Sequence, residues 1–183
     1  MRLRATILAG CAALAAAMGV AHAGEGSARR APSAEAAWLA AHNRERAAFG
    51  SAPLAWNAAL ADEARAWAAR LARENVLRHS ARHERGGTGE NLWMGSAGYY
   101  SPSDMIAAFT GEKRHFRAGT FPHVSRTGNW ADVGHYTQVV WADTREVGCA
   151  TARGPQFDGL VCRYWPAGNV MGERIAPARL AVR

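Results

Sequence analysis

One carboxylate of this chain occupies a position where an apolar side chain is expected. The segment after residue 101 predicts a helix whose inward stripe carries Met105, Phe109 and Phe116, and Glu112 falls on that stripe. A carboxylate is costly to bury alone, so Glu112 needs either a metal ion or a hydrogen-bonding partner. The structural alternative is a simple pair with an arginine or a helix-end amide, and the sequence leaves both readings open.

Three further residues carry groups that bind metals or transfer protons. His135 follows Gly134, His79 ends a predicted helical region, and Glu90 follows the glycine-rich loop 86–89. Two histidines and two carboxylates are ligand types that suit zinc or a similar divalent ion. The four side chains lie far apart in the sequence and form no short-spaced ligand motif, so their spacing alone is weak evidence for a site.

Capping residues predict the helices that would position these side chains. Ser33 and Gly50 bound one helix, and Asn57 begins a second with an apolar stripe. Ser101 begins the third, since it is followed by a proline and then by a carboxylate three residues on.

Strands are expected near residues 136–141, 146–151 and 158–165, after the helices. Helices precede strands without alternation, which predicts an α+β domain with an antiparallel sheet. Cys149 and Cys162 flank a turn near residues 154–156, so a hairpin folded there would bring them opposite each other and favour a disulfide. Two buried thiols are the alternative.

The ends of the chain read as processing and linker segments. Residues 1–23 have the form of a signal peptide, with a positive start, an apolar run and a small-x-small site that ends in Ala23. A lipoprotein site at Cys11 is the alternative, although the apolar run before it is short. We expect a secreted or periplasmic protein without a transmembrane segment, with a flexible leader over 24–33 and a tail over 172–183.

The charge of the chain bears on its partners. It carries 22 Lys and Arg against 15 Asp and Glu, a formal charge of +7. The basic residues are scattered among acids, as on a solvated basic surface, and attraction to anionic envelope polymers or lipid head groups is a second interpretation. Export and the lack of interleaved aromatic and basic residues argue against nucleic acid as a partner. Frequent Arg and Ala indicate a bacterial source.

Seven motifs, taken in order, resemble those of the CAP superfamily, also called the SCP domain, which comprises cysteine-rich secretory, antigen 5 and pathogenesis-related proteins. The resemblance covers residues 34–171. The motifs are His42-Asn43-x-x-Arg46, Leu54-x-Trp56, His79-Ser80, Gly89-Glu90-Asn91-Leu92, Phe109-x-x-Glu112-Lys113, Gly134 to Trp141, and Cys162-x-Tyr164 to Asn169.

The resemblance implies an α-β-α sandwich, with a three-stranded antiparallel sheet between helical layers. It also implies a cleft lined by His79, Glu90, Glu112 and His135, with a divalent metal such as zinc between the two histidines. The chain departs from the family pattern at two positions. Phe109 stands where tryptophan is common, and Gly159 stands where an apolar residue is usual.

Several functions are compatible with such a cleft. The resemblance favours a binding module for a lipid, a sterol or another envelope component. Such a module requires no cofactor and no nucleophile. A metal-assisted hydrolase of peptidase type is the alternative, with Glu90 or Glu112 as candidate catalytic base. Glycoside hydrolysis by the same two carboxylates ranks lower, and a purely structural role for the four residues remains open.

Overall fold

The computed structural model describes residues 32–176. The predicted signal peptide, with Ala23 and Cys11, and most of the predicted leader and tail lie outside these residues. The elements follow the order α1 (Ala34–Phe49), β1 (Ala55–Trp56), α2 (Ala58–Glu74), η1 (Arg82–Arg85), β2 (Gly89–Ser96), α3 (Pro102–Thr110), η2 (Gly111–His115), β3 (Gly119–Thr120), η3 (Trp130–Val133), α4 (Gly134–Val140), β4 (Glu146–Arg153), β5 (Phe157–Trp165) and β6 (Arg174–Ile175).

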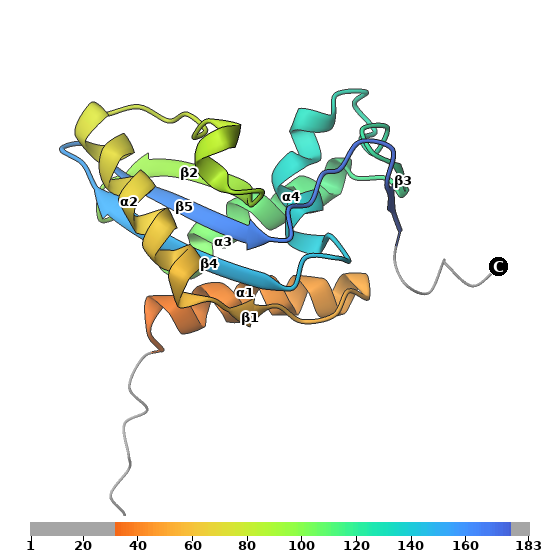
Figure 1. Cartoon of the computed structure of the whole chain (residues 1–183), viewed down its shortest axis with the longest axis horizontal. Coiled ribbons are helices and arrows are strands. Elements are labelled where there is room, and N and C mark those ends of the chain that lie inside the picture. Colours follow the sequence, from red (N-terminus) through yellow and green to blue (C-terminus); the bar gives the residue numbers. More distant parts are fainter. Residues whose placement is uncertain (1–31, 177–183) are drawn as a thin grey trace, which may run out of the picture. The chain divides into compact units, whose positions relative to one another are not determined.

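The main sheet has four strands in the order β1-β4-β5-β2 (Figure 1). Strands β4, β5 and β2 are antiparallel, whereas β1 pairs in parallel with β4 through Ala55 opposite Glu146. The expected three-stranded sheet was therefore wrong by one strand. The chain runs alongside β4 for two residues before α2 begins, which is too short a segment for a strand pattern to be visible in the sequence. A separate two-stranded sheet joins β3 to β6.

The strand expected at 136–141 is instead the helix α4. Its β-branched and aromatic residues favour a strand, but residues 136–140 are all buried, so no alternation of polar and apolar positions marks either structure. The third long strand is β2, which begins inside the expected glycine loop and pairs with β5 from Gly89 to Ser96. The polar residues Glu90 and Asn91 interrupt the apolar pattern of β2, so the sequence did not predict this strand.

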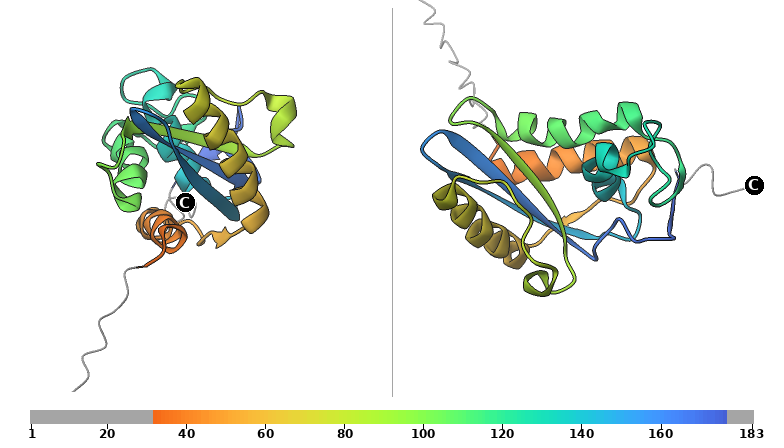
Figure 2. Two further views of the ribbon diagram at one scale, coloured as in Figure 1. Left: turned by 90° about the vertical axis from the view of Figure 1, so that its left-hand side faces the viewer. Right: turned by 90° about the horizontal axis from the view of Figure 1, so that it is seen from above.

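Helices cover both faces of the main sheet (Figure 2). Helix α2 packs on β4 and β5 through Ala64, Trp67, Ala68 and Leu71, and α1, α3 and α4 form the larger core on the other face. The approach of α2 is close because β4 has a glycine at 148, where a Cβ atom would overlap the helix backbone. The sandwich of helical layers around a sheet is thus present.

The predicted caps are confirmed. Ser33 accepts a hydrogen bond from the amide of Ala36, and Asn57 accepts one from the amide of Leu60. Ser101 and Asp104 form the reciprocal bonds of a capping box at the start of α3. These caps set where α1, α2 and α3 begin.

The predicted disulfide is also confirmed. Cys149 and Cys162 are directly opposite each other in β4 and β5, with Cα atoms 4.1 Å apart. The bond joins the two central strands of the sheet.

Arg46 fixes α4 against α1. Its guanidinium is buried and donates to the carbonyls of Val139, Trp141 and Thr144 at 2.8–2.9 Å, and its Nε donates to Ala52. Carbonyls at the end of a helix lack partners within the helix, so a cation placed there is favourable. One buried arginine thereby holds the helix that begins with Gly134 and His135.

Within residues 32–176, no helix has the length and apolar character needed to cross a bilayer.

Candidate functional site

His79 and Glu90 form the first of two carboxylate–histidine pairs. His79 lies in the loop after α2, and its Nδ1 donates to Oε1 of Glu90 in β2 at 2.6 Å. Ser80 donates to the same carboxylate through its amide at 3.1 Å and its hydroxyl at 2.8 Å. Arg163 of β5 adds an ion pair at 3.1 Å. Glu90 is therefore a buried carboxylate with donors on both oxygens.

These contacts determine the charge of Glu90. Burial raises the pKa of Glu90, but the hydrogen bonds from His79 and Ser80 and the charge of Arg163 outweigh it and leave the pKa below its ordinary value. The carboxylate is ionised at neutral pH. The Arg163 Nη1 atom is close to Glu90 without hydrogen-bond geometry, so the contact is electrostatic.

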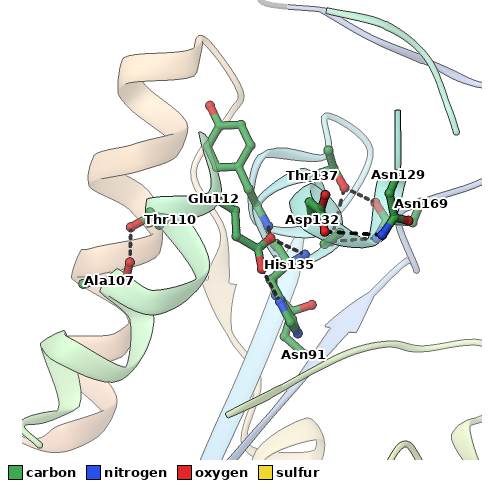
Figure 3. A network of polar contacts seen from close by, with 12 residues as sticks. Asn91, Ala107, Thr110, Glu112, Asn129, Asp132, His135, Thr137 and Asn169 are labelled. Atoms are coloured by element: carbon green, nitrogen blue, oxygen red, sulfur yellow. Dashed lines mark hydrogen bonds and ion pairs between the residues drawn. The ribbon is translucent and has the colours of Figure 1, made fainter. Parts of the chain in front are cut away.

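His135 and Glu112 form the second pair (Figure 3). Nδ1 of His135 donates to Oε1 of Glu112 at 2.6 Å, while Oε2 accepts from the backbone amides of His135 at 3.0 Å and Tyr136 at 3.1 Å. Glu112 lies in η2, just after α3, and binds the first turn of α4. The unexpected inward carboxylate thus has a helix-end amide and an imidazole as partners at once.

Neighbouring groups hold the His135 ring and the wall beside it. Phe109 stacks on the ring, with centroids 5.0 Å apart and an interplanar angle of 20°. Asn169 donates to the carbonyl of Gly134 at 2.8 Å and accepts from Thr137 at 2.7 Å, so the segment after β5 is tied to α4. The orientation of His135 is therefore set by α3 and Glu112 together.

A cavity of about 770 Å³ joins the two pairs. His79, Glu90 and His135 line it, whereas Glu112 is not among the lining residues and lies behind His135. Since each Nδ1 atom donates to a carboxylate, Nε2 is the nitrogen of each ring that a neutral imidazole would offer to a ligand. A carboxylate behind the imidazole is the usual arrangement around histidines that bind metals, so the donor set fits a divalent ion.

A second group of ligand atoms offers no metal site. His42, Cys149 and Cys162 place one ligand atom each within 4.8 Å of one another. Both cysteines are joined in the disulfide and supply no thiolate, and both ring nitrogens of His42 already have partners.

The sequence reasoning missed much of the cavity lining. Arg82 and Arg85 of η1 line it, as do Trp130 of η3 and Val170 and Met171 after β5. A tryptophan in the polar loop before α4 was a signal that could have been followed. No sequence signal distinguished the two arginines as lining residues, because arginine is common throughout this chain.

Comparison with known proteins identifies relatives of this chain. The model of the family described as "CAP: Cysteine-rich secretory protein family" matches residues 39–164. Pathogenesis-related protein 1C of Nicotiana tabacum is 37% identical over 138 residues, which are 74% of this chain and 77% of that protein. Venom allergen 5 of Polybia paulista is 36% identical over 130 residues, which are 67% of this chain and 60% of the allergen.

Solved structures share the fold. The crystal structure of NaASP2 with Zn2+ superposes with a TM-score of 0.64 at 26% identity, and the match covers 76% of this chain and 83% of that one.

Proposed function

Because this chain belongs to the CAP family, the cysteine-rich secretory proteins, we propose that it is a ligand-binding module whose cleft takes a lipid, a sterol or another envelope component and can hold a divalent metal ion. The observation that carries the proposal is the pair of carboxylate-bound histidines, His79 and His135, on one cavity.

The size and lining of the cavity suit a small ligand. Its volume of about 770 Å³ lies within the roughly 300–1,000 Å³ range of sites for small molecules. Phe121, Trp130, Val170 and Met171 give it apolar wall, while the histidines and arginines supply a few polar groups. An apolar or amphipathic molecule would find both kinds of contact.

A divalent ion would be held by the Nε2 atoms of His79 and His135. A bound ion would supply a Lewis acid that attracts an anionic or carbonyl group of the ligand. Glu90 and Glu112 keep the protons on the Nδ1 atoms and so orient both rings. The NaASP2 structure with Zn2+ supports zinc as the ion to test first.

The contacts of the carboxylates favour binding over hydrolysis. Glu90 accepts three hydrogen bonds and an ion pair, and Glu112 accepts three hydrogen bonds. A general base needs a free lone pair aimed at the water or substrate proton, and here both carboxylates are directed at protein groups. The same contacts weigh against a glycosidase, which needs one carboxylic acid and one free carboxylate.

Export is part of the proposal. The family to which the chain belongs is described as secretory, and we propose that a bacterial cell exports this protein with cleavage after Ala23. Amino-terminal sequencing of the protein from the periplasm or medium of a bacterial host tests this. Gly24 is the expected first residue, and an acylated Cys11 would overturn the proposed cleavage.

Calorimetric titration with zinc tests the site. We expect saturable binding of one ion by the wild-type protein, and loss of that binding in His79→Ala and in His135→Ala. His123→Ala is the matched control, because His123 is exposed and does not line the cavity. Equal zinc affinity in all four proteins would refute the metal site. Failure of lipids, sterols and envelope polymers alike to bind the wild-type protein would refute the binding module.

A further inference from the structure

We propose that the cleft selects an acidic amphiphile, whose acid group binds Arg82 and Arg85 and whose chain lies on Trp130, Val170 and Met171. This inference rests on the proposed function and narrows its ligand class. It distinguishes a carboxylate or phosphate carried on an apolar chain from a neutral sterol, whose single hydroxyl has no charge to pair with the arginines.

Within residues 32–176, the two arginines that line the cavity, Arg82 and Arg85, form no ion pair. Both belong to η1, and the Nε atom of Arg85 is buried without an acceptor within residues 32–176. The neighbouring Glu84 accepts from the backbone amide of Ala81 at 3.0 Å and forms no ion pair with Arg82 or Arg85. In the described part of the chain, the arginines with an ion pair are Arg65, Arg70, Arg78, Arg153 and Arg163.

The nearby carboxylate does not neutralise these arginines. Glu90 also lines the cavity, but its charge is balanced by Arg163 and its oxygens accept from His79 and Ser80. The two arginines of η1 outnumber the single carboxylate of Glu84 in the same segment, so η1 keeps an excess of positive charge. The buried Nε atom of Arg85 has no acceptor, which is unfavourable, and a carboxylate or phosphate would supply the charged hydrogen bond that it lacks.

The apolar wall is exposed to an unusual degree. Trp130, Val170 and Met171 keep 42%, 44% and 63% of their surface exposed although they line a cavity. Trp130 packs edge-on against the buried Phe121, at 5.3 Å between ring centroids. Clustered exposed apolar side chains indicate a binding surface, since single ones are common but groups are not.

The two walls together define the ligand. The arginines come from the segment before β2, and the apolar residues come from η3 and the segment after β5. A molecule with an acid at one end and a chain at the other satisfies both walls. Inorganic phosphate would leave the apolar wall uncovered, and a sterol would offer the arginines one neutral hydroxyl and no negative charge. The proposed cleavage after Ala23 removes Arg2 and Arg4 and lowers the formal charge from +7 to +5, which still attracts an anion from a distance.

Calorimetry with decanoate, decyl phosphate, 1-decanol and inorganic phosphate tests the proposal on the full-length protein. We expect either acidic amphiphile to bind at least about tenfold more tightly than decanol, the factor typical of a charged hydrogen bond, and phosphate alone to bind weakly. The double variant with Arg82→Gln and Arg85→Gln should remove that advantage. Trp130→Ala should lower the affinity for the acidic amphiphiles and for decanol by the same factor, because all of them carry a decyl-type apolar chain. Arg65→Gln is the control, because Arg65 is exposed on α2 away from the cavity.

Vesicles distinguish the two sources of such a ligand. Sedimentation with phosphatidylglycerol vesicles that is lost in the double arginine variant would identify a bilayer lipid, and decanoate binding without sedimentation would identify a free amphiphile. Circular dichroism verifies that each variant is folded.

Two results would overturn the inference in different ways. Equal affinity for decanoate and decanol, unchanged in the double arginine variant, would refute the acidic ligand and leave the binding module intact. No binding of decanoate, decanol, cholesterol or envelope polymers to the wild-type protein would refute the proposed binding function itself.

Discussion

Acidification below pH 6.5 should destabilise this protein through one buried histidine. His42 is completely buried, and its Nδ1 lies 2.8 Å from the carbonyl of Trp38 while its Nε2 lies 2.8 Å from the hydroxyl of Tyr164. A carbonyl can only accept, so Nδ1 carries the proton and Nε2 accepts from Tyr164. Asn91 already donates to the same hydroxyl at 3.2 Å. A second proton on His42 would leave the tyrosine hydrogen without an acceptor.

The size of the effect follows from the pKa. Burial lowers the pKa of His42 to about 4 from its ordinary 6.5; the bond to Trp38 opposes this shift and the charge of Arg46 adds to it. Between these values the unfolded chain binds the proton and the folded protein does not, so stability falls as the pH falls. The free energy of unfolding then changes by up to about 1.4 kcal/mol per pH unit, and its total loss by pH 4 is about 3 kcal/mol.

Urea denaturation at several pH values measures this loss. The comparison is made between pH 6.5 and 5, above the range where carboxylates titrate. We expect His42→Gln to be less stable than the wild-type protein at pH 7. Its free energy of unfolding should, however, vary less with pH than that of the wild-type protein. His123→Gln, which removes an exposed histidine, should keep the wild-type slope. A slope in His42→Gln equal to that of the wild-type protein would refute the assignment to His42.

Four further changes test the packing that holds the site together. Arg46→Met should lower the free energy of unfolding by at least about 3 kcal/mol in urea denaturation, because several buried carbonyls lose their donor. Replacement of Cys149 and Cys162 by alanine should cost about 3 kcal/mol from the freed loop, and wild-type protein in reductant should match that variant. Gly148→Ala should destabilise by several kcal/mol, since its Cβ would overlap the backbone of α2. Gly159→Ala should change stability by less than about 1 kcal/mol in thermal denaturation, because the nearest atom lies 4.0 Å from the added carbon.

Local rules in the sequence determined much of the frame. The caps at Ser33, Asn57 and Ser101 act through bonds to amides only a few residues away, so composition and order were sufficient to place them. The disulfide between Cys149 and Cys162 followed from a hairpin whose turn lies between them. Glu112 was recognisable as a carboxylate in need of a partner, because its helical position faced inward.

Contacts between distant segments decided the rest. The helix over residues 136–140 is held at its end by Arg46, some ninety positions earlier, which donates to the carbonyls of Val139 and Trp141. Strand β2 forms because β5 pairs along its length, which its own residues do not reveal. The cavity brings η1, η3 and the segment after β5 around the histidines, and no periodicity in one segment can report where the others will lie. The sequence by itself thus determined the types and local shapes of the parts, and tertiary packing alone decided which of them meet.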